Sequence, residues 1–244
     1  MPWLSVITVT WNAGKALQKT YESLRNQDNK NFEWIIIDGG SSDETLSLIT
    51  SFGDFVSKWV SEKDGGIYDA MNKGLSLATG DYVWFLNAGD CASDAEVITR
   101  LYKVNGAGVL YGDAKMITPE GKDLGLRRGG VPSTLQLSDL RTGLKVSHQA
   151  TIVKRSIAPE YNLKYKITGD LDWLIRILKT GASTKSVNGI ICVFETGGVS
   201  GTRYREAMIE RYNCLAFHFG IFPTLFAHIW IIIKAPFVRL FYRY

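Results

Sequence analysis

Residues 34–43 read Trp34-Ile35-Ile36-Ile37-Asp38-Gly39-Gly40-Ser41-Ser42-Asp43, and this stretch decides the fold. A short run of consecutive apolar residues indicates a strand that is buried on both faces of a sheet. The glycine pair ends the strand, and Ser42 or Asp43 can cap a following helix. A buried strand that leads directly into a helix is the repeating unit of α/β folds.

The same strand–helix pattern recurs along the first ninety residues. We expect strands at residues 4–9, 34–37, 55–60 and 82–86, with helices around residues 17–24, 46–49 and 67–78 between them. This alternation predicts an α/β fold with an open, mostly parallel sheet and helices on both faces. The second half is less regular, with expected strands at 109–111, 146–153 and 190–194 and a helix at 172–178.

Polar side chains follow each of the first four expected strands. They are Thr10 and Asn12, then Asp38, then Asp64, then Asn87 and Asp90. Ligands of such sheets bind beyond the carboxyl ends of the strands, so we expect these groups at one edge. Asp38 suits a hydrogen bond to a ribose or a base, whereas Asp43 needs no ligand because it can cap a helix. The sequence has neither GxGxxG nor GxxxxGK[ST], so a dinucleotide fingerprint and a P-loop are both excluded.

Asp90 can hold a divalent cation against a diphosphate, although the Asn87–Asp90 segment fits a plain polar turn equally well. In Asp170-Leu171-Asp172, one carboxylate suits a general base and the other a helix cap.

Three more side chains are weaker candidates. His148 is more typical of a structural group than of a catalyst, and we assign it with Asp172 only weakly to an acceptor side. Arg203 and Arg205 could bind a pyrophosphate, or they could be the solvated start of a helix.

Several of these segments together resemble family 2 glycosyltransferases. The residues that carry the resemblance are Val6 to Asn12, Ile35 to Asp43 and Gly80 to Asp90. Residues 61–74, which include Asp64 and Lys73, together with 147–150 and 197–200, resemble the subgroup that builds bacterial exopolysaccharides, including colanic-acid-type enzymes. The resemblance covers residues 1–212.

The resemblance implies a GT-A fold, a nucleotide-diphospho-sugar donor, a divalent metal (Mn²⁺ or Mg²⁺) and inversion at the anomeric carbon. Asp38 matches the nucleoside-binding carboxylate, Asp90 the last Asp of a DXD-type motif, and Asp170 the catalytic base. The chain departs from the Asp-x-Asp-Asp pattern, because Asn87 and Gly89 occupy the other two acidic positions. We assign to donor binding Thr10, Asn12, Asp38, Asp64, Lys73, Asn87, Arg203 and Arg205.

Charge is distributed unevenly along the 244 residues. The first 200 residues hold 22 basic and 22 acidic residues, so the net charge of +4 lies entirely in residues 201–244, with six basic and two acidic. This charge is too small to indicate nucleic acid binding. Residues 212–233 contain no charged residue, and Lys234, Arg239 and Arg243 follow among aromatic residues. This pattern favours a tail that lies on an anionic membrane surface over one that spans the membrane or folds onto the enzyme.

We therefore expect a GT-A domain at residues 1–212, with a nucleotide-sugar half at 1–113 and an acceptor half at 114–212, and a tail at 213–244. A chain that ends at Tyr212 should stay folded. Three scattered cysteines and the lack of a signal peptide predict a cytoplasmic enzyme, peripheral on the inner face of the membrane. The expected function is sugar transfer to a saccharide in bacterial surface or exopolysaccharide synthesis, and we expect this acceptor to be lipid-linked. The alternatives are a nucleotidyltransferase and a non-catalytic scaffold that binds sugar nucleotides.

Overall fold

We analysed a computed structural model, which describes residues 1–127, 130–197, 203–226 and 228–229. The motif residues 198–200 and the basic residues Lys234, Arg239 and Arg243 lie outside these ranges. The strands are β1 (Leu4–Thr10), β2 (Phe32–Asp38), β3 (Lys58–Ser61), β4 (Tyr82–Phe85), β5 (Cys91–Ala92), β6 (Val109–Ile117), β7 (Asp123–Leu126), β8 (Thr151–Lys154) and β9 (Thr184–Glu195). The α-helices are α1 (Gly14–Arg25), α2 (Thr45–Ser51), α3 (Ile67–Leu77), α4 (Val97–Lys103), α5 (Gly169–Lys179) and α7 (Tyr204–Phe219).

All the described strands belong to one sheet in the order β3-β2-β1-β4-β8-β6-β9-β5, and β7 pairs with β6. β1 pairs in parallel with β2 and β4, β2 with β3, and β6 with β9. β8 is antiparallel to both β4 and β6, so β6 and β9 run in the same direction as β1. The carboxyl ends of six strands therefore lie at one edge, which we call the C-terminal edge of the sheet.

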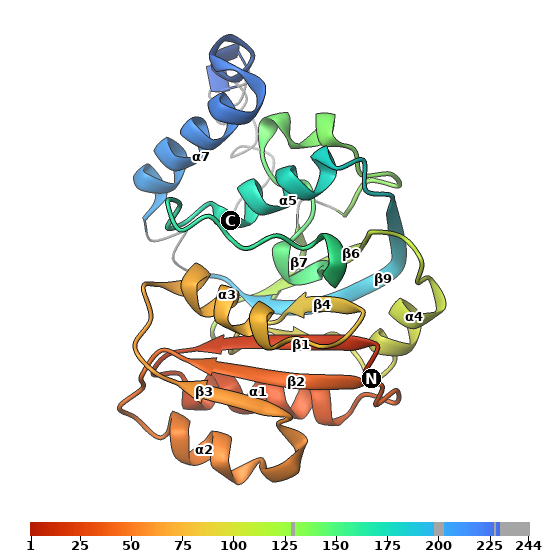
Figure 1. Cartoon of the computed structure of the whole chain (residues 1–244), viewed down its shortest axis with the longest axis vertical. Coiled ribbons are helices and arrows are strands. Elements are labelled where there is room, and N and C mark those ends of the chain that lie inside the picture. Colours follow the sequence, from red (N-terminus) through yellow and green to blue (C-terminus); the bar gives the residue numbers. More distant parts are fainter. Residues whose placement is uncertain (128–129, 198–202, 227, 230–244) are drawn as a thin grey trace.

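Helices cover both faces of the sheet, as the alternating pattern predicts (Figure 1). Successive side chains of a strand point to opposite faces, and the buried residues accordingly divide into two cores. Ile7 of β1 packs in the core that includes Met71 of α3 and Leu174 of α5. Val6 packs in the other core, with Leu17 of α1.

Three expected elements begin or end elsewhere. The third strand starts at Lys58 because residues 53–55 form a 3₁₀ turn, and β8 starts at Thr151 because another 3₁₀ turn takes up residues 148–150. α5 begins at Gly169, so Asp170 lies in the first turn of this helix and does not precede it.

Helix α7 continues across the boundary that we expect between residues 212 and 213. Its residues Cys214 and Leu215 are fully buried in the core that also contains Trp173 of α5. His218 Nε2 lies 2.8 Å from Asp172 Oδ1 of α5, across the interface between the two helices. These contacts contradict a boundary at Tyr212, because the folded domain reaches at least to His218.

Beyond α7 the chain is helical again at residues 221–226 and 228–229, where Phe222 and Phe226 are exposed. In the described part of the chain, no helix has the length and the apolar character that a membrane crossing requires.

Candidate active site

A cavity of about 740 Å³ opens at the C-terminal edge of the sheet. The segment that follows β4, the turn that precedes β8, the start of α5 and the end of β9 all contribute to its wall. Of the residues singled out in the sequence, Asn87, Asp90, His148, Asp170 and Arg203 line it. The C-terminal end of β4 and the N-terminal end of β8 thus meet in one cavity, because β8 is antiparallel to β4.

Asp90 lies on the β4 side of the cavity and is 8 % exposed. Burial raises the pKa of Asp90 to about 7, against the hydrogen bonds that its carboxylate receives from Asn87 and Gln149. A buried carboxylate with so high a pKa lacks a neutralising positive charge. Gly89 adopts φ +98°, a left-handed backbone conformation that favours glycine in the turn before Asp90.

Sequence reasoning missed two charged residues near Asp90. Glu195, at the end of β9, lines the same cavity, and its charge contributes to the raised pKa of Asp90. Lys19 of α1 pairs with Glu195 at 2.5 Å. Glu195 supplies a second carboxylate at this cavity, where the DXD-like segment has only Asp90. Lys19 and Glu195 are 176 positions apart in the sequence, so no local sequence pattern indicates that they pair.

Asp170 lines the cavity from the first turn of α5. Burial raises its pKa to about 6, and the backbone N–H of Leu171 and the nearby Arg127 guanidinium moderate the rise. A pKa near the working pH is what a general base requires, because the group must both hold and release a proton. Tyr68 packs against Gly169, where a Cβ would come within 2.7 Å of the tyrosine ring, and it donates a hydrogen bond to the carbonyl of Ile167 at 2.8 Å.

A third missed residue, Glu210 of α7, holds the segment that leads into Asp170. Its carboxylate accepts hydrogen bonds from the backbone N–H groups of Lys166, Ile167 and Thr168, at 2.8, 2.8 and 2.9 Å. Burial alone would raise the pKa of Glu210, but these hydrogen bonds outweigh it and lower the pKa. α7 therefore fixes the position of the loop in front of the candidate base.

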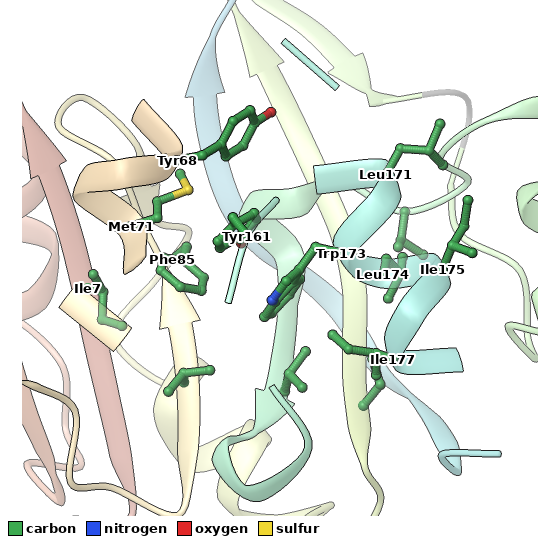
Figure 2. Close-up of a cluster of buried hydrophobic side chains, with 14 of the residues drawn as sticks. Ile7, Tyr68, Met71, Phe85, Tyr161, Leu171, Trp173, Leu174, Ile175 and Ile177 are labelled. Carbon is green, nitrogen blue, oxygen red and sulfur yellow. The ribbon is translucent and has the colours of Figure 1, made fainter. Parts of the chain in front are cut away.

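A buried cluster of aromatic rings extends from Tyr68, which lines the cavity, into the core. Tyr161 lies between Tyr68 of α3 and Trp173 of α5 (Figure 2), with ring centroids 5.2 and 5.0 Å away. His148 stacks on Phe85, and its Nε2 lies 2.7 Å from the Tyr161 hydroxyl. Burial lowers the pKa of His148 to about 4, so this imidazole is neutral at physiological pH. That environment fits the structural role that is usual for a lone histidine.

A second group of expected donor residues, Asn12, Asp38 and Asp64, lies beside the Gly39–Gly40 turn and does not line the cavity. The amide oxygen of Asn12 accepts the N–H of Ser42 at 2.8 Å, and Asp64 Oδ1 accepts the N–H of Gly66 at 2.9 Å. A Cβ on Gly39 would lie 2.6 Å from Asp64, so glycine allows the two loops to approach. The four polar clusters therefore do share one edge of the sheet, as predicted.

Asp38 is fully buried at this turn. Its Oδ2 accepts hydrogen bonds from the N–H of Ser41 at 2.9 Å and from the hydroxyl of Ser61 at 2.7 Å, and the Ser41 hydroxyl donates to Oδ1. With these partners in place, Asp38 presents no exposed surface to a donor in this conformation. In this conformation Asp38 orders the turn, and direct contact with a nucleoside stays a prediction.

Two of the remaining expected donor residues, Lys73 and Arg203, have local partners. Lys73 pairs with Glu62 at 2.8 Å, and Arg203 donates to Glu206 at 3.0 Å. Thr10 is buried at the end of β1, and Arg205 is exposed on α7, away from the cavity wall. Their roles in donor binding stay predictions.

Asp172 lies outside the cavity wall, at the interface of α5 and α7. Together with Cys214 and His218 it forms a group whose candidate metal-ligand atoms lie within 4.8 Å of one another. Both carboxylate oxygens already have partners, Arg176 Nε at 2.8 Å and His218 Nε2 at 2.8 Å. The ion pair with Arg176 lies within α5, and the hydrogen bond with His218 joins the two helices, so Asp172 has a structural role here.

The sequence profile of glycosyl transferase family 2 matches residues 5–148, which run from β1 through β7 to the start of the turn before β8. The chain belongs to glycosyl transferase family 2. Among similar proteins, a PGL/p-HBAD biosynthesis glycosyltransferase of Mycobacterium tuberculosis is 31 % identical over 223 residues, which cover 86 % of this chain and 84 % of the relative. The GalNAc(5)-diNAcBac-PP-undecaprenol beta-1,3-glucosyltransferase of Campylobacter jejuni is 34 % identical over 109 residues, which cover 43 % and 35 %.

Solved structures support the GT-A fold of this glycosyltransferase. S. aureus TarS 1-349 in complex with UDP-GlcNAc superposes with a TM-score of 0.66 and 19 % identity, covering 88 % of this chain and 67 % of that one. Mannosyltransferase PcManGT from Pyrobaculum calidifontis in complex with GDP-Man and Mn²⁺ gives a TM-score of 0.65 and 16 % identity, covering 93 % and 70 %. At these identities the likeness establishes the fold.

Proposed function

We propose that this glycosyltransferase inverts the anomeric centre of a sugar that it takes from a nucleotide-diphospho-sugar. The single observation that carries the proposal is that Asp170 and Asp90, both with raised pKa values, line the same cavity. Two carboxyl groups in different environments can take different roles. Asp170 has the pKa of a base, and Asp90 has the buried, unneutralised charge of a cation ligand.

In the proposed reaction a hydroxyl oxygen of the acceptor attacks the anomeric carbon from the face opposite the leaving group. Asp170 takes the hydroxyl proton while the bond between the anomeric carbon and the phosphate oxygen breaks. The bonding electron pair leaves with the nucleoside diphosphate, so the configuration inverts. Tyr68 borders the base, and Tyr161 stacks on Tyr68 in a buried aromatic cluster that also contains Trp173.

We propose that Asp90 holds a divalent cation, Mn²⁺ or Mg²⁺, and the carboxylate of Glu195 can complete the site. The mannosyltransferase named above was solved with Mn²⁺. When bound, such an ion neutralises the charge of the departing diphosphate.

The decisive experiment is a donor screen in which UDP- and GDP-sugars are incubated with Mn²⁺ and the released nucleoside diphosphate is measured. Slow, Mn²⁺-dependent release from at least one donor is expected. A nucleotidyltransferase would instead form the sugar nucleotide from a nucleoside triphosphate and a sugar phosphate. A non-catalytic scaffold would bind a donor without cleaving it.

We further propose a lipid-linked saccharide acceptor in bacterial surface or exopolysaccharide synthesis, and a peripheral location on the inner face of the membrane. The Campylobacter relative is named for a saccharide linked through diphosphate to undecaprenol, which supports the acceptor class. Exposed Phe217, Ile221, Phe222 and Phe226 lie before the basic segment that contains Lys234, Arg239 and Arg243. Apolar and basic residues in succession suit an anionic lipid surface.

Two truncations should separate folding from membrane binding. A chain that ends at residue 212 loses Cys214, Leu215 and the His218–Asp172 contact, so we expect its unfolding free energy to fall by about 4 kcal/mol. A chain that ends at residue 229 keeps these contacts and should unfold at the wild-type temperature. Thermal unfolding followed by circular dichroism measures both.

The chain that ends at residue 229 lacks three basic residues, each worth about 1 kcal/mol at an anionic surface, so its binding to anionic vesicles should weaken about a hundredfold. Cosedimentation with phosphatidylserine vesicles measures the loss, and neutral phosphatidylcholine vesicles are the control. If the full chain and the chain that ends at residue 229 pelleted equally with phosphatidylserine vesicles, the membrane role of residues 230–244 would be refuted.

A further inference from the structure

A second cavity, of about 220 Å³, adjoins the candidate active site between α5 and α7. Arg127, Leu144, Ile167 and Asp170 line both cavities, so the second is a lateral extension of the first. Figure 1 shows α7 beside α5 at the end of the molecule farthest from α2. We call this extension the arginine groove.

The arginine groove combines two guanidinium groups with an apolar wall. Arg127 and Arg211 supply the positive charges, and the apolar wall consists of Leu144, Ile167, Leu171, Ala207 and Met208. The groove thus joins a cationic part, which suits phosphate oxygens, to an apolar part, which suits a hydrocarbon chain.

The position of Arg211 is defined by its surroundings. Its guanidinium donates a hydrogen bond to the carbonyl of Thr142, and it packs on Gly143, where a Cβ would come within 2.8 Å of it. Gly143 also has φ +101°, a conformation that favours glycine. Both this backbone conformation and the contact with Arg211 therefore favour glycine at this position. The side chain is therefore held in place and does not sample the solvent freely.

The acidic residue next in sequence to Arg211 has its carboxylate hydrogen-bonded to another segment. Glu210 directs its carboxylate to the backbone N–H groups of residues 166–168. Asp170 is the carboxyl group that lines the groove, and it does so at the end shared with the active site. An anion in the groove would accordingly lie close to the base without taking the place of the donor beside Asp90.

We propose that the arginine groove binds the diphosphate of a lipid-diphosphate acceptor, with Arg127 and Arg211 on the phosphate oxygens and the first part of the lipid chain along α7. The inference rests on the proposed function, because it assigns a binding site to the acceptor of that reaction. It also explains why the groove opens beside Asp170, where an acceptor hydroxyl has to arrive. The exposed apolar residues beyond α7, Phe222 and Phe226, lie farther along the same C-terminal segment.

Calorimetric titration with farnesyl diphosphate tests the proposal. The donor site is first saturated with Mn²⁺ and UDP or GDP, whichever binds, so that the probe cannot occupy it. Farnesyl diphosphate should then bind the full chain at least about tenfold more tightly than farnesol or inorganic pyrophosphate, because each of these lacks one half of the recognised structure.

Arg211→Gln and Arg127→Gln should each weaken farnesyl diphosphate about ten- to hundredfold, as expected for the loss of a charge-assisted hydrogen bond. Arg25→Gln, at the exposed end of α1, is the matched control and should bind as wild type. Since Arg211 also bonds to Thr142, Ala207→Glu serves as a second variant. It places a negative charge in the groove at a helical position that tolerates glutamate, and it should abolish binding.

The outcomes separate the two proposals. If Mn²⁺ and nucleoside diphosphate bind but farnesyl diphosphate does not, or if it binds all variants equally, the groove assignment is wrong and the donor site stands. Pyrophosphate binding as tight as that of farnesyl diphosphate would contradict a lipid ligand. If no nucleoside diphosphate binds, the proposed transferase function fails, and the farnesyl diphosphate titration of the free protein still decides the groove.

Discussion

Asp170→Asn should lower the rate of sugar transfer by about 10²–10⁴, the usual effect of losing a positioned general base, while the affinity for the donor stays unchanged. Asparagine keeps the shape of the side chain and can still accept the N–H of Leu171, which the carboxylate accepts at 2.8 Å. It cannot take a proton from the acceptor hydroxyl. Single-turnover transfer and donor titration, measured separately, would show the loss in the first and not in the second.

The pH profile gives an independent readout of the same residue. Because the pKa of Asp170 is raised to about 6, its carboxylate is protonated below that pH and cannot act as a base. The rate of transfer under saturating donor and metal should therefore rise with pH through about 6 and level off above it.

Asp81→Asn, on the exposed loop before β4, is the control and should keep both the rate and the profile. The roles of the two α5 carboxylates would have to be exchanged if Asp172→Asn were inactive but folded while Asp170→Asn kept its turnover.

Asp90→Asn should abolish the Mn²⁺ dependence of donor binding and lower the transfer rate by about 10²–10³, comparable to the loss of one group that stabilises developing charge. A neutral amide oxygen is a poorer ligand for a hard divalent cation than a carboxylate. Titration of nucleoside diphosphate with and without Mn²⁺ measures the effect. An unchanged response to Mn²⁺ in this variant would show that the ion is held elsewhere.

The raised pKa of Asp90 also predicts that protons compete with the metal ion for its carboxylate. Without a cation its pKa is raised to about 7, so below that pH the ion must displace a proton. The apparent Mn²⁺ affinity should fall about tenfold for each pH unit below 7 and become independent of pH above it. In Asp90→Asn this dependence should vanish.

The folding stability of Asp90→Asn shows whether lost activity reflects unfolding. A raised carboxyl pKa means that the folded state holds a proton that the unfolded state releases, so in wild type this group's contribution to stability is lost as pH rises from about 4 to 7. Asparagine has no such titration. The variant should therefore unfold at pH 8 no earlier than wild type, which thermal unfolding without metal would measure.

The sequence predicts the C-terminal edge of the sheet well because it depends on short-range patterns. Apolar runs that end in polar turns put Asn87 and Asp90 at the cavity, and Asn12, Asp38 and Asp64 at the adjoining turn. The period of side-chain burial along a strand and the parallel order of the strands follow from the same patterns.

What the sequence could not indicate depends on contacts between distant segments. Glu210 reaches back more than forty residues to hold the loop before Asp170, and Glu195 meets Lys19 from the far end of the chain. The start of α5 at Gly169 was also not predicted. Glycine is not a typical residue for a helix start, and it is needed here because it packs closely against the Tyr68 ring. The boundary at Tyr212 failed for a similar reason, since tertiary burial of Cys214 and Leu215 extends a helix that composition alone assigns to the tail.

The separation of the two edges of the sheet makes this protein convenient to immobilise in a known orientation. Asp54 is exposed in the turn before β3, at the edge opposite the cavity, so a cysteine there would point a surface linker away from the site. Burial raises the pKa of Cys91 to about 11 and that of Cys214 to about 12, and it raises the pKa of Cys192 well above its usual value. Because the thiolate is the reactive form, a maleimide at pH 7 should select Asp54→Cys without removal of the native thiols. Molecules tethered in this way would all present the cavity and the arginine groove to the solution, which suits surface-based measurements of donor and lipid binding.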